Sequence, residues 1–361
     1  NGASMKCLIL ALCATLAYAQ YEGHQLLQLR PTYEWQSRAL RDLMLADTEL
    51  DFWTEPTRTN EPVDVRVPPH KLDFLRQRTA SLHIPMTVLD TNIQDAVDEE
   101  KALMQKRGKA FDLNDWNDFD TIIGWVNDLA DSCPPELSCS VRNIGSTSEG
   151  RDMIVFTVSS GQASRGVWLD STIHAREWLA PATVVNIMNK VVNDYGVDSE
   201  VTDMLDKHDM HFLPVMNPDG YQYTFTNERL WRKNRATNAG SSCRGTDLNR
   251  NYDWKWGMEG VSNLPCSDLY CGASGGSELE TQAVQNEGER LAGTLDAWIT
   301  FHSYGNMWMH PWGNTINHAG QTCERADDHA EMFALAEITA DAIQATFNTR
   351  WARGTSCEVI Y

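Results

Sequence analysis

The chain has 361 residues, enough for two domains of ordinary size, and 42% of them are apolar, which excludes a disordered chain. Its formal net charge is −20, so the surface of clustered lysines and arginines that nucleic-acid binding needs is not expected. We therefore expect a two-domain globular protein that does not bind nucleic acid.

The first residues have the composition of a secretory leader. Met5-Lys6 provides a positive start, residues 7–18 form an apolar run too short to span a bilayer, and residues 17–19 (Ala-Tyr-Ala) fit a signal-peptidase site. The four residues before Met5 look like translated non-coding sequence. The alternative is a short core helix. The leader interpretation predicts a signal peptide over residues 5–19, a mature chain that begins near Gln20, secretion, and no membrane anchor.

Residues 22–104 alternate between strand-like and helix-like patterns. Strands are predicted at residues 23–29, 50–53 and 63–67, and helices at residues 32–47 and, after a Pro-Pro pair, at about 70–82. A β-α-β-β-α-β order over this length predicts a small open-faced α/β sandwich.

A charged, helix-prone segment follows over residues 98–109 and ends in Lys106, Arg107 and Lys109. The simplest interpretation is a solvated linker. Basic residues on an exposed linker are also what a trypsin-like protease cleaves, and proteolysis concentrates on such segments.

From Phe111 onward the pattern changes to longer α/β units. Buried strands are predicted at residues 153–158, 167–170, 211–215 and 295–301, and a long apolar helix is predicted at residues 177–195. This alternation predicts a largely parallel or mixed sheet with helices on both faces.

Two histidine motifs follow predicted strands of this domain. His174-Ala-Arg-Glu177 lies just past the 167–170 strand and opens the predicted helix, where open α/β sheets place ligand sites, and His302 ends the 295–301 strand. A histidine and a carboxylate three residues apart can bind one Zn²⁺ and leave room for a third ligand and a water. Either motif alone is weak, because His-x-x-Glu arises by chance and a lone histidine is more often a structural core residue.

Two arginine-rich segments lie between these histidine motifs. They are Arg229-Leu-Trp-Arg232 and Gly245-Thr-Asp-Leu-Asn-Arg-Asn251. An Asn-Arg pair beside further arginines in so acidic a chain suits bidentate binding of a carboxylate. The alternative is a set of surface ion pairs, which contribute little to stability.

The cysteine count bears on the compartment. Two of the nine cysteines, Cys7 and Cys13, lie in the predicted leader, which leaves seven. Secretion would permit disulfides. Because seven is odd, at least one cysteine stays free or pairs outside the chain.

The order of the motifs is more informative than any one of them. His-x-x-Glu, Arg-Leu-Trp-Arg-Lys, Asp-x-Asn-Arg-Asn and His-Ser-Tyr, in that order, resemble the pancreatic-type carboxypeptidase A/B family of zinc peptidases. The segments Asn-Pro-Asp-Gly-Tyr at residues 217–221 and Cys-Ser-Asp-Leu-Tyr at residues 266–270 also match. Gly-His-Gln at 23–25, Leu-Asp-Phe-Trp at 50–53 and Val-Asp-Val-Arg-Val-Pro at 63–68 resemble the family's propeptide. The resemblance covers residues 22–361.

The resemblance implies a fold and an activity. It implies an α/β fold with a mixed sheet of the eight-stranded type flanked by helices, preceded by an α+β activation domain of the ferredoxin-like kind. The implied division is a propeptide over residues 20–108 and a catalytic domain over residues 109–361. The implied activity is hydrolysis of the C-terminal peptide bond of peptides and proteins, in a monomer that a trypsin-like protease activates by removing the propeptide.

The resemblance also implies roles for individual residues. His174, Glu177 and His302 would bind one Zn²⁺, and Asp247 would orient the first histidine through its other ring nitrogen. Arg232 would polarise the scissile carbonyl. The remaining residues would contact substrate: Asn249 and Arg250 at its α-carboxylate, Arg176, Arg229 and Tyr304 at more distal positions, and Tyr361 as the mobile tyrosine that closes over it.

Disulfides and specificity follow from the same comparison. Cys243–Cys266 matches the family's shared disulfide and Cys323–Cys357 a bridge of some members; Cys133–Cys139 is expected as a local pair, which leaves Cys271. Gly313 matches a pocket-wall position that is Gly in A-type members, and Met309 nearby is apolar. We therefore expect a preference for apolar or aromatic C-terminal residues.

The match stops at the last residue of the sequence. The family's catalytic glutamate and the residue at the base of its specificity pocket lie C-terminal to the position of Tyr361, so we expect a partial chain with little activity and an active complete product. The alternative is a catalytically inactive member that binds peptides or zinc. A glutamate at the family's base position would favour the enzyme, and any other residue there would favour the binding protein.

Overall fold

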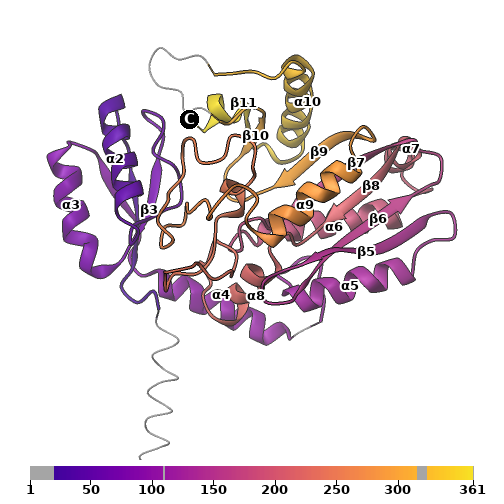
Figure 1. Cartoon of the computed structure of the whole chain (residues 1–361), viewed down its shortest axis with the longest axis horizontal. Helices are drawn as coiled ribbons and strands as arrows, with labels where there is room; N and C mark the ends of the chain where they lie inside the picture. Colours follow the sequence, from indigo (N-terminus) through magenta and orange to yellow (C-terminus); the bar gives the residue numbers. More distant parts are fainter. Residues whose placement is uncertain (1–19, 109, 315–322, 361) are drawn as a thin grey trace, which may run out of the picture. The chain divides into compact units, whose positions relative to one another are not determined.

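The computed structural model describes residues 20–108, 110–314 and 323–360, so the predicted leader, residues 5–19, lies outside the described part. The chain divides into two compact units, Asn1–Lys106 with Asn306–Tyr361, and Arg107–Gly305 (Figure 1). The predicted catalytic domain, residues 109–361, therefore contributes to both units. No helix in the described ranges combines the length and the apolar composition that a membrane span needs.

The N-terminal part of the first unit has the predicted β-α-β-β-α-β order. Its elements are β1 (Gln25–Leu29), α2 (Glu34–Ala46), β2 (Asp51–Phe52), β3 (Val63–Val67), the short helix η1 (Pro69–Lys71), α3 (Leu72–Ser81) and β4 (Met86–Asp90). The four strands form an antiparallel sheet in the order β2-β3-β1-β4, with Leu27 opposite Val65. The prediction of a small α+β sandwich is confirmed.

Alternating apolar residues explain this small domain. Leu27 and Leu29 of β1 and the valines of β3 point to one face of the sheet because successive strand residues face opposite sides. They pack against Leu40 of α2 and Leu75 of α3, and all of them are fully buried or nearly so. The polar residues between them remain at the surface.

The charged segment after this domain is helical, as its helix-prone composition predicts. Helix α4 (Ile93–Arg107) includes Lys106 and Arg107 of the predicted linker. Its Ala, Leu, Met, Gln, Glu and Lys residues have high helix propensity, which explains the helix. Gly108 follows with φ +90, in the left-handed region that commonly ends helices. Lys109 lies outside the described residues.

The second unit contains the mixed sheet that the sequence predicts. Its strands are β5 (Ser138–Ser146), β6 (Asp152–Ser159), β7 (Arg165–Ser171), β8 (His208–Leu213) and β9 (Leu295–Phe301), in the order β5-β6-β8-β7-β9. Strand β7 is parallel to both β8 and β9, whereas β6 is antiparallel to β5 and β8. Helices α5 (Phe119–Asp131), α6 (Leu179–Asn193), α7 (Ser199–Lys207) and α9 (Leu279–Arg290) pack against this sheet (Figure 1).

The core of the second unit surrounds Trp168 of β7. Met153 and Val155 of β6, Leu213 of β8 and Val284 of α9 are buried with it. Except for Val284, these residues come from the apolar runs that predicted the strands, so the prediction and this part of the core agree.

Several element boundaries differ from the prediction by one to three residues, and two of the differences bear on the site. Strand β8 ends at Leu213 rather than residue 215, because Pro214 has no N–H for the ladder and its carbonyl accepts from the Ser171 hydroxyl instead. The long helix α6 begins at Leu179 rather than Glu177. Residues 172–178 form a tight turn instead, with Thr172 at φ 65.

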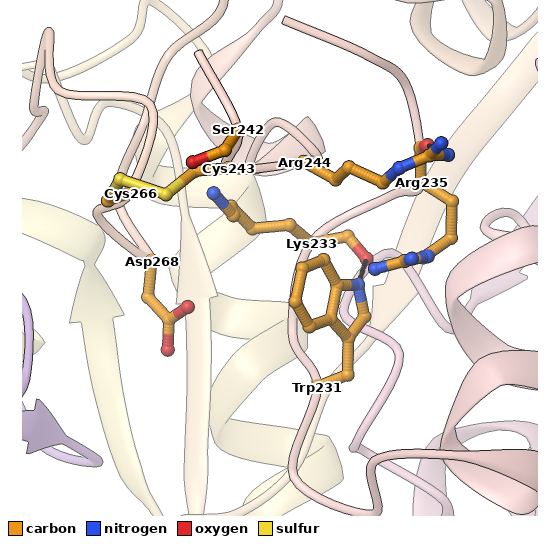
Figure 2. A pocket seen from close by; sticks show the side chains of 8 residues that line it. All are labelled: Trp231, Lys233, Arg235, Ser242, Cys243, Arg244, Cys266 and Asp268. Carbon is orange, nitrogen blue, oxygen red and sulfur yellow. Dashed lines mark hydrogen bonds between the residues drawn. A yellow bond between two sulfur atoms is a disulfide. The ribbon is translucent and has the colours of Figure 1, made fainter.

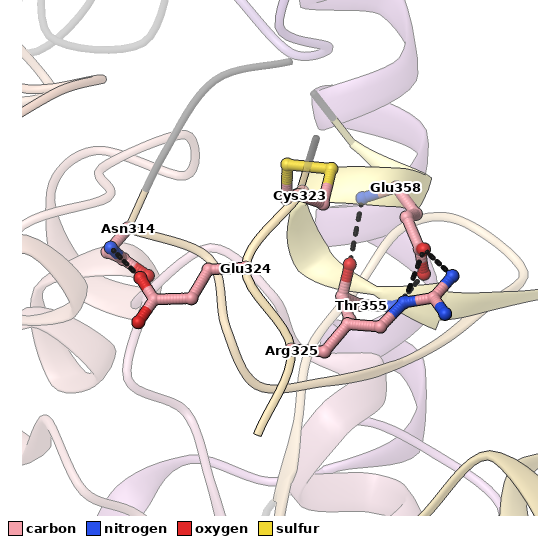
Figure 3. Close-up of a disulfide and its surroundings, with 7 residues drawn as sticks. Asn314, Cys323, Glu324, Arg325, Thr355 and Glu358 are labelled. Atoms are coloured by element: carbon pink, nitrogen blue, oxygen red, sulfur yellow. Dashed lines mark hydrogen bonds and ion pairs between the residues drawn. A yellow bond between two sulfur atoms is a disulfide. The ribbon is translucent and has the colours of Figure 1, made fainter. Parts of the chain in front are cut away.

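The C-terminal part of the first unit has its own small sheet. Strands β10 (Met307–His310) and β11 (Ala352–Thr355) are parallel, and α10 (His329–Phe347) and α11 (Ser356–Val359) accompany them. Cys323 forms a disulfide with Cys357, and Arg325 donates to Glu358, which also closes a capping box with Thr355 (Figure 3). Met309 lies on β10. A Cβ atom on Gly313 would come within 2.7 Å of the Ser356 Cβ, so this position has no room for a larger residue.

Candidate metal centre

Two neighbouring strands deliver the three predicted metal ligands. Strands β7 and β9 are parallel neighbours with Ser171 opposite Phe301, so their carboxyl ends lie side by side. His302 follows β9 directly, and His174 and Glu177 lie on the turn after β7. The donor atoms of these three residues all lie within 4.8 Å of one another. No other group of three such side chains in the described ranges comes this close.

The Glu177 carboxylate lies between the two histidines. Its Oε1 is 2.7 Å from His174 Nδ1, and its Oε2 is 3.0 Å from His302 Nδ1. The backbone N–H of Ser303 also donates to Oε2. Each histidine therefore presents Nδ1 to the same small volume.

Opposing effects set the charge of this cluster. Burial raises the pKa of Glu177, but the two histidines outweigh burial and hold this pKa well below its ordinary value. Burial lowers the pKa of His302, but the Glu177 carboxylate outweighs burial and raises it. An ionised carboxylate and two imidazole nitrogens form a donor set that fits Zn²⁺ with one position open for water.

Asp247 supports His174 from the opposite side of the ring. Its Oδ1 is 3.0 Å from His174 Nε2, and its Oδ2 accepts from Arg232 Nε at 3.2 Å and Nη2 at 2.9 Å. Burial alone would raise the pKa of Asp247, but Arg232 and His174 outweigh it and keep this pKa well below its usual value. An ionised Asp247 accepts the Nε2 proton of His174, which leaves Nδ1 free to bind a metal.

The contact between Arg232 and Asp247 was not predicted. The sequence analysis assigned Arg232 to the substrate carbonyl and Asp247 to His174, without a link between them. The two residues are 15 positions apart, and no helical or strand spacing relates them. The backbone also joins the motifs, because the Ala175 N–H donates to the Arg232 carbonyl at 2.9 Å.

The Asn-Arg pair follows Asp247 on the short helix η2 (Leu248–Arg250). Asp247 caps this helix, since its Oδ1 also accepts from the Asn249 N–H at 2.9 Å. Arg250 donates through Nε to the Gly260 carbonyl and through Nη1 to the Asn249 carbonyl. The side chain of Asn249 is exposed. The predicted carboxylate-binding pair thus lies in the segment that Asp247 anchors.

Arg176 lies on the turn that carries His174, and Arg229 packs against that turn. Arg229 donates to the Arg176 carbonyl at 3.0 Å, and its guanidinium lies 3.6 Å over the Trp178 ring. Arg176 donates to the Leu230 carbonyl and lies 3.7 Å from Asp268. Cation–π stacking and these hydrogen bonds hold the two segments together.

The remaining predicted site residues are Tyr304, Met309, Gly313 and Tyr361. Tyr304 is two residues past His302 and is 53% exposed. Met309 and Gly313 belong to the other compact unit. Tyr361 lies outside the described residues.

The three expected disulfides are all present. They are Cys133–Cys139, Cys243–Cys266 and Cys323–Cys357. Cys271 is buried and forms no disulfide, as the odd count required.

Asp170 is a buried acidic residue that the sequence analysis missed. It lies near the end of β7, and its Oδ2 accepts from the indole N–H groups of Trp168 and Trp298, each at 2.8 Å. Burial raises its pKa. Because Trp298 is on β9, this carboxylate bridges the two strands that deliver the metal ligands. A carboxylate two residues after a tryptophan in a buried strand was the signal available in the sequence.

A mixed α/β sheet with a His-Glu-His donor set at its strand ends defines a metal-dependent hydrolase. Residues 122–361 match the family described as zinc carboxypeptidase, and residues 27–100 match the carboxypeptidase activation peptide. The chain therefore belongs to the zinc carboxypeptidase family and carries the family's activation peptide. The predicted cofactor, one catalytic Zn²⁺, is the one that this family uses.

Relatives of both specificity types match nearly the whole chain. Zinc carboxypeptidase A 1 of Anopheles gambiae is 35% identical over 99% of this chain and 81% of its own. Carboxypeptidase A2 of Rattus norvegicus is 35% identical, with 98% and 85% covered, and carboxypeptidase B of Homo sapiens is 32% identical, with 99% and 85% covered.

Solved structures confirm the fold. Carboxypeptidase A from Helicoverpa armigera superposes with a TM-score of 0.84 at 25% identity, covering 95% of this chain and 83% of its own. Thrombin-activatable fibrinolysis inhibitor superposes with a TM-score of 0.81 at 27% identity, covering 94% and 85%. A zinc carboxypeptidase with an activation peptide is the zymogen of a zinc exopeptidase, so this part of the predicted function is confirmed.

Proposed function

We propose that the chain is a secreted procarboxypeptidase that hydrolyses the C-terminal peptide bond of peptides and proteins. In this proposal residues 20–108 are the activation segment and residues 109–361 are catalytic. The observation that carries the proposal is the approach of His174, Glu177 and His302 to within 4.8 Å, with Asp247 linking His174 to Arg232.

His174 Nδ1, the Glu177 carboxylate and His302 Nδ1 would hold the zinc ion. Bound zinc supplies Lewis-acid chemistry, because it lowers the pKa of a bound water and polarises a carbonyl. Asp247 keeps the proton of His174 on Nε2 and holds the guanidinium of Arg232 in place. Arg232 would then donate hydrogen bonds to the oxygen of the scissile carbonyl as negative charge develops on it.

The restriction to C-termini would come from Asn249 and Arg250. A guanidinium and an amide can bind both oxygens of a free carboxylate, which an internal peptide bond does not offer. Arg176, Arg229 and Tyr304 would contact residues further from the scissile bond, and Tyr361 would close over the bound C-terminal residue.

We further propose a preference for apolar or aromatic C-terminal residues. Gly313, at a position that is Gly in A-type members of the family, and the apolar Met309 support this preference. Relatives named carboxypeptidase A and carboxypeptidase B match at similar identity, so the preference rests on these two residues.

Activation and proton transfer complete the proposal. We propose that a trypsin-like protease removes the activation segment by cutting near Lys106–Lys109, and that the protein is a monomer. None of the glutamates in residues 1–361 matches the family's general base, so this sequence as written would show little peptidase activity. Appreciable turnover of a blocked dipeptide by this chain after cleavage would contradict that part.

The decisive test of the mechanism is Arg232→Ala in the activated, complete enzyme. Loss of a preorganised donor to the developing oxyanion is expected to lower kcat by roughly 100- to 1,000-fold with a much smaller change in KM. Blocked dipeptides with a C-terminal Phe provide the assay, and Lys207→Ala, an exposed cation elsewhere in the same unit, is the control.

Arg232 also contacts Asp247, so the zinc content of Arg232→Ala must be measured with its kinetics. A raised KM with unchanged kcat would contradict the assigned role. Loss of zinc would assign the effect to the support of His174 instead.

A further inference from the structure

A cavity of about 290 Å³ lies beside the segment that carries Arg232 (Figure 2). Trp231, Lys233 and Arg235 line it, whereas Arg232 contacts Asp247 and Asn234 contacts Glu278. Alternate residues of this extended segment thus serve two different places. Arg232 and Asn234 contact the metal centre and the start of α9, whereas the residues that alternate with them line the cavity.

The charge of the cavity is predominantly positive. Lys233, Arg235 and Arg244 contribute three cations, and Asp268 contributes one carboxylate. Ser242 and the Cys243–Cys266 disulfide complete the wall near the Lys233 amine (Figure 2). In a chain with a net charge of −20, such a cluster does not follow from composition.

Two of these cations are deeply buried. Lys233 is 3% exposed and donates to the Pro265 carbonyl at 2.6 Å. Arg235 is 9% exposed, and its guanidinium lies 3.7 Å over the Tyr223 ring and 4.4 Å over the Trp231 ring. Buried charges are costly unless they are paired, and burial lowers the pKa of Lys233 accordingly.

The hydrogen-bonding capacity of Arg235 is not satisfied. Its Nε is buried and has no hydrogen-bond partner in the described residues. The Glu149 carboxylate lies 3.8 Å from this atom and forms an ion pair with Arg235, although it is beyond hydrogen-bonding distance. Arg244, at the exposed edge of the cavity, makes only a long contact of 3.5 Å with the Arg235 carbonyl. Donors are thus available to a ligand.

We propose that this cavity binds an oxyanion group, either an acidic side chain of the peptide substrate or a free phosphate. Binding of an acidic substrate side chain rests on the proposed function and on Asp268. Asp268 borders the cavity and lies 3.7 Å from the predicted substrate-binding residue Arg176. The cavity would then select peptides that carry Glu or Asp several residues before the scissile bond.

The test begins with inorganic phosphate and the full-length chain at low ionic strength. Isothermal titration calorimetry is expected to detect binding, and Arg244→Glu is expected to weaken it at least about 10-fold by reversing one of the three charges. Arg244 is exposed, so this variant should fold. Lys207→Glu, the same change of charge at an exposed site outside the cavity, should bind phosphate normally.

The second arm uses peptides on the zinc-loaded chain after trypsin treatment. Labelled hexapeptides share a C-terminal Phe and carry one Glu or one Gln at each of the third to sixth positions from that end. Fluorescence anisotropy measures binding without requiring hydrolysis. At one position the Glu peptide should bind about 10-fold more tightly than its Gln partner. Arg244→Glu should abolish this difference, and Lys207→Glu should keep it.

The outcomes separate this proposal from the proposed function. Phosphate binding that Arg244→Glu weakens, with no Glu preference at any position, assigns the site to free oxyanions. Phosphate binding with no peptide binding at all would overturn the carboxypeptidase proposal and leave the site intact. Absence of both phosphate binding and a Glu preference would overturn the oxyanion site.

Discussion

Asp247 makes charged contacts on both of its oxygens in a fully buried position. One oxygen is 3.0 Å from His174 Nε2, and the other accepts two hydrogen bonds from Arg232. This carboxylate therefore fixes a metal ligand and a catalytic candidate at once. A change at Asp247 should affect the metal centre although Asp247 does not itself belong to the donor set.

We predict that Asp247→Asn lowers zinc affinity by roughly 10- to 100-fold. The asparagine amide has the same shape but is neutral. Its NH₂ group must face either His174 Nε2–H or the Arg232 guanidinium, and neither donor can then form its hydrogen bond to that group. Competition with a chromogenic chelator measures the affinity. Asp296→Asn, an exposed acid in the same unit, should leave it unchanged. Zinc affinity equal to that of the unmodified chain would show that His174 does not need its partner.

Sequence order predicted individual residues better than it predicted their contacts. The residues with a motif of their own, His174, Glu177 and His302, could be identified, and they lie together. The contact of Arg232 with Asp247 and the bridge that Asp170 makes to Trp298 could not, because such contacts depend on how separate segments pack. Spacing along one strand or helix carries no information about them.

Helix α9 begins beside a buried pair of carboxylates. Asn234 donates to Glu278 at 2.8 Å and to Glu280 at 3.1 Å, and one oxygen of Glu280 is buried without a hydrogen-bond partner in the described residues. Burial raises the pKa of Glu280 to about 7, and the nearby Asp219 and Glu278 contribute. The N-terminus of this helix therefore holds a proton that an exposed glutamate would release.

We predict that Glu280 makes stability fall as the pH rises from about 4.5 to 7. Its folded-state pKa lies above its unfolded value, so the unfolded chain releases the proton first, and stability is lost as the pH rises through the folded-state pKa. The difference corresponds to about 3 kcal/mol. Glu280→Gln should remove this component of the pH dependence.

Thermal unfolding at pH 5 and pH 8 measures this effect. The difference in Tm between the two pH values should shrink in Glu280→Gln and persist in Glu289→Gln, an exposed position on the same helix. An unchanged difference in Glu280→Gln would show that Glu280 is ionised in the folded protein.

At the scale of elements, buried apolar runs were the reliable signal. Strands β6, β7 and β9 were predicted close to their bounds because apolar residues predominate in their sequences. Strand β5 was missed because many of its residues are exposed and polar. Helix α9 was missed for a related reason, since its sequence has few apolar residues and contains Gly288. Tertiary packing overrides such weak local preferences.

At the scale of the whole molecule, the segment after the activation domain contains the proposed cleavage site. Helix α4 reaches Arg107, whose guanidinium contacts Asp115 and the Trp116 carbonyl. Lys106 and Gly108 are exposed. A protease therefore reaches Lys106 and Gly108 more easily than the side chain of Arg107.

We predict that brief trypsin treatment cuts the chain first within residues 106–109. The triple variant Lys106→Gln, Arg107→Gln, Lys109→Gln should resist this first cut, whereas Lys101→Gln, in the body of α4, should not. Gel electrophoresis and N-terminal sequencing of the products provide the measurement. A first cut elsewhere that releases the catalytic part would contradict the proposed activation site.

The order of the two domains was predictable because the sequence changes at Phe111 from short strand-like and helix-like segments to longer α/β units. The sequence could not predict that α4 continues through the basic cluster, because charged residues of high helix propensity suit a solvated linker and a helix equally well. Only the left-handed Gly108 marks its end, and φ is not visible in a sequence.

The Cys243–Cys266 bridge closes a ring of chain that contains Asp247, Asn249 and Arg250. A closed loop of this length stabilises the folded state by about 3 kcal/mol through the unfolded chain alone. The same covalent ring supports the carboxylate grip and one wall of the basic cavity. Recombinant production should therefore succeed in an oxidising compartment and fail selectively in a reducing cytosol. Material from the cytosol should bind both substrate and zinc more weakly, because the ring contains Asp247 as well as Asn249 and Arg250, although none of the three metal ligands lies within it.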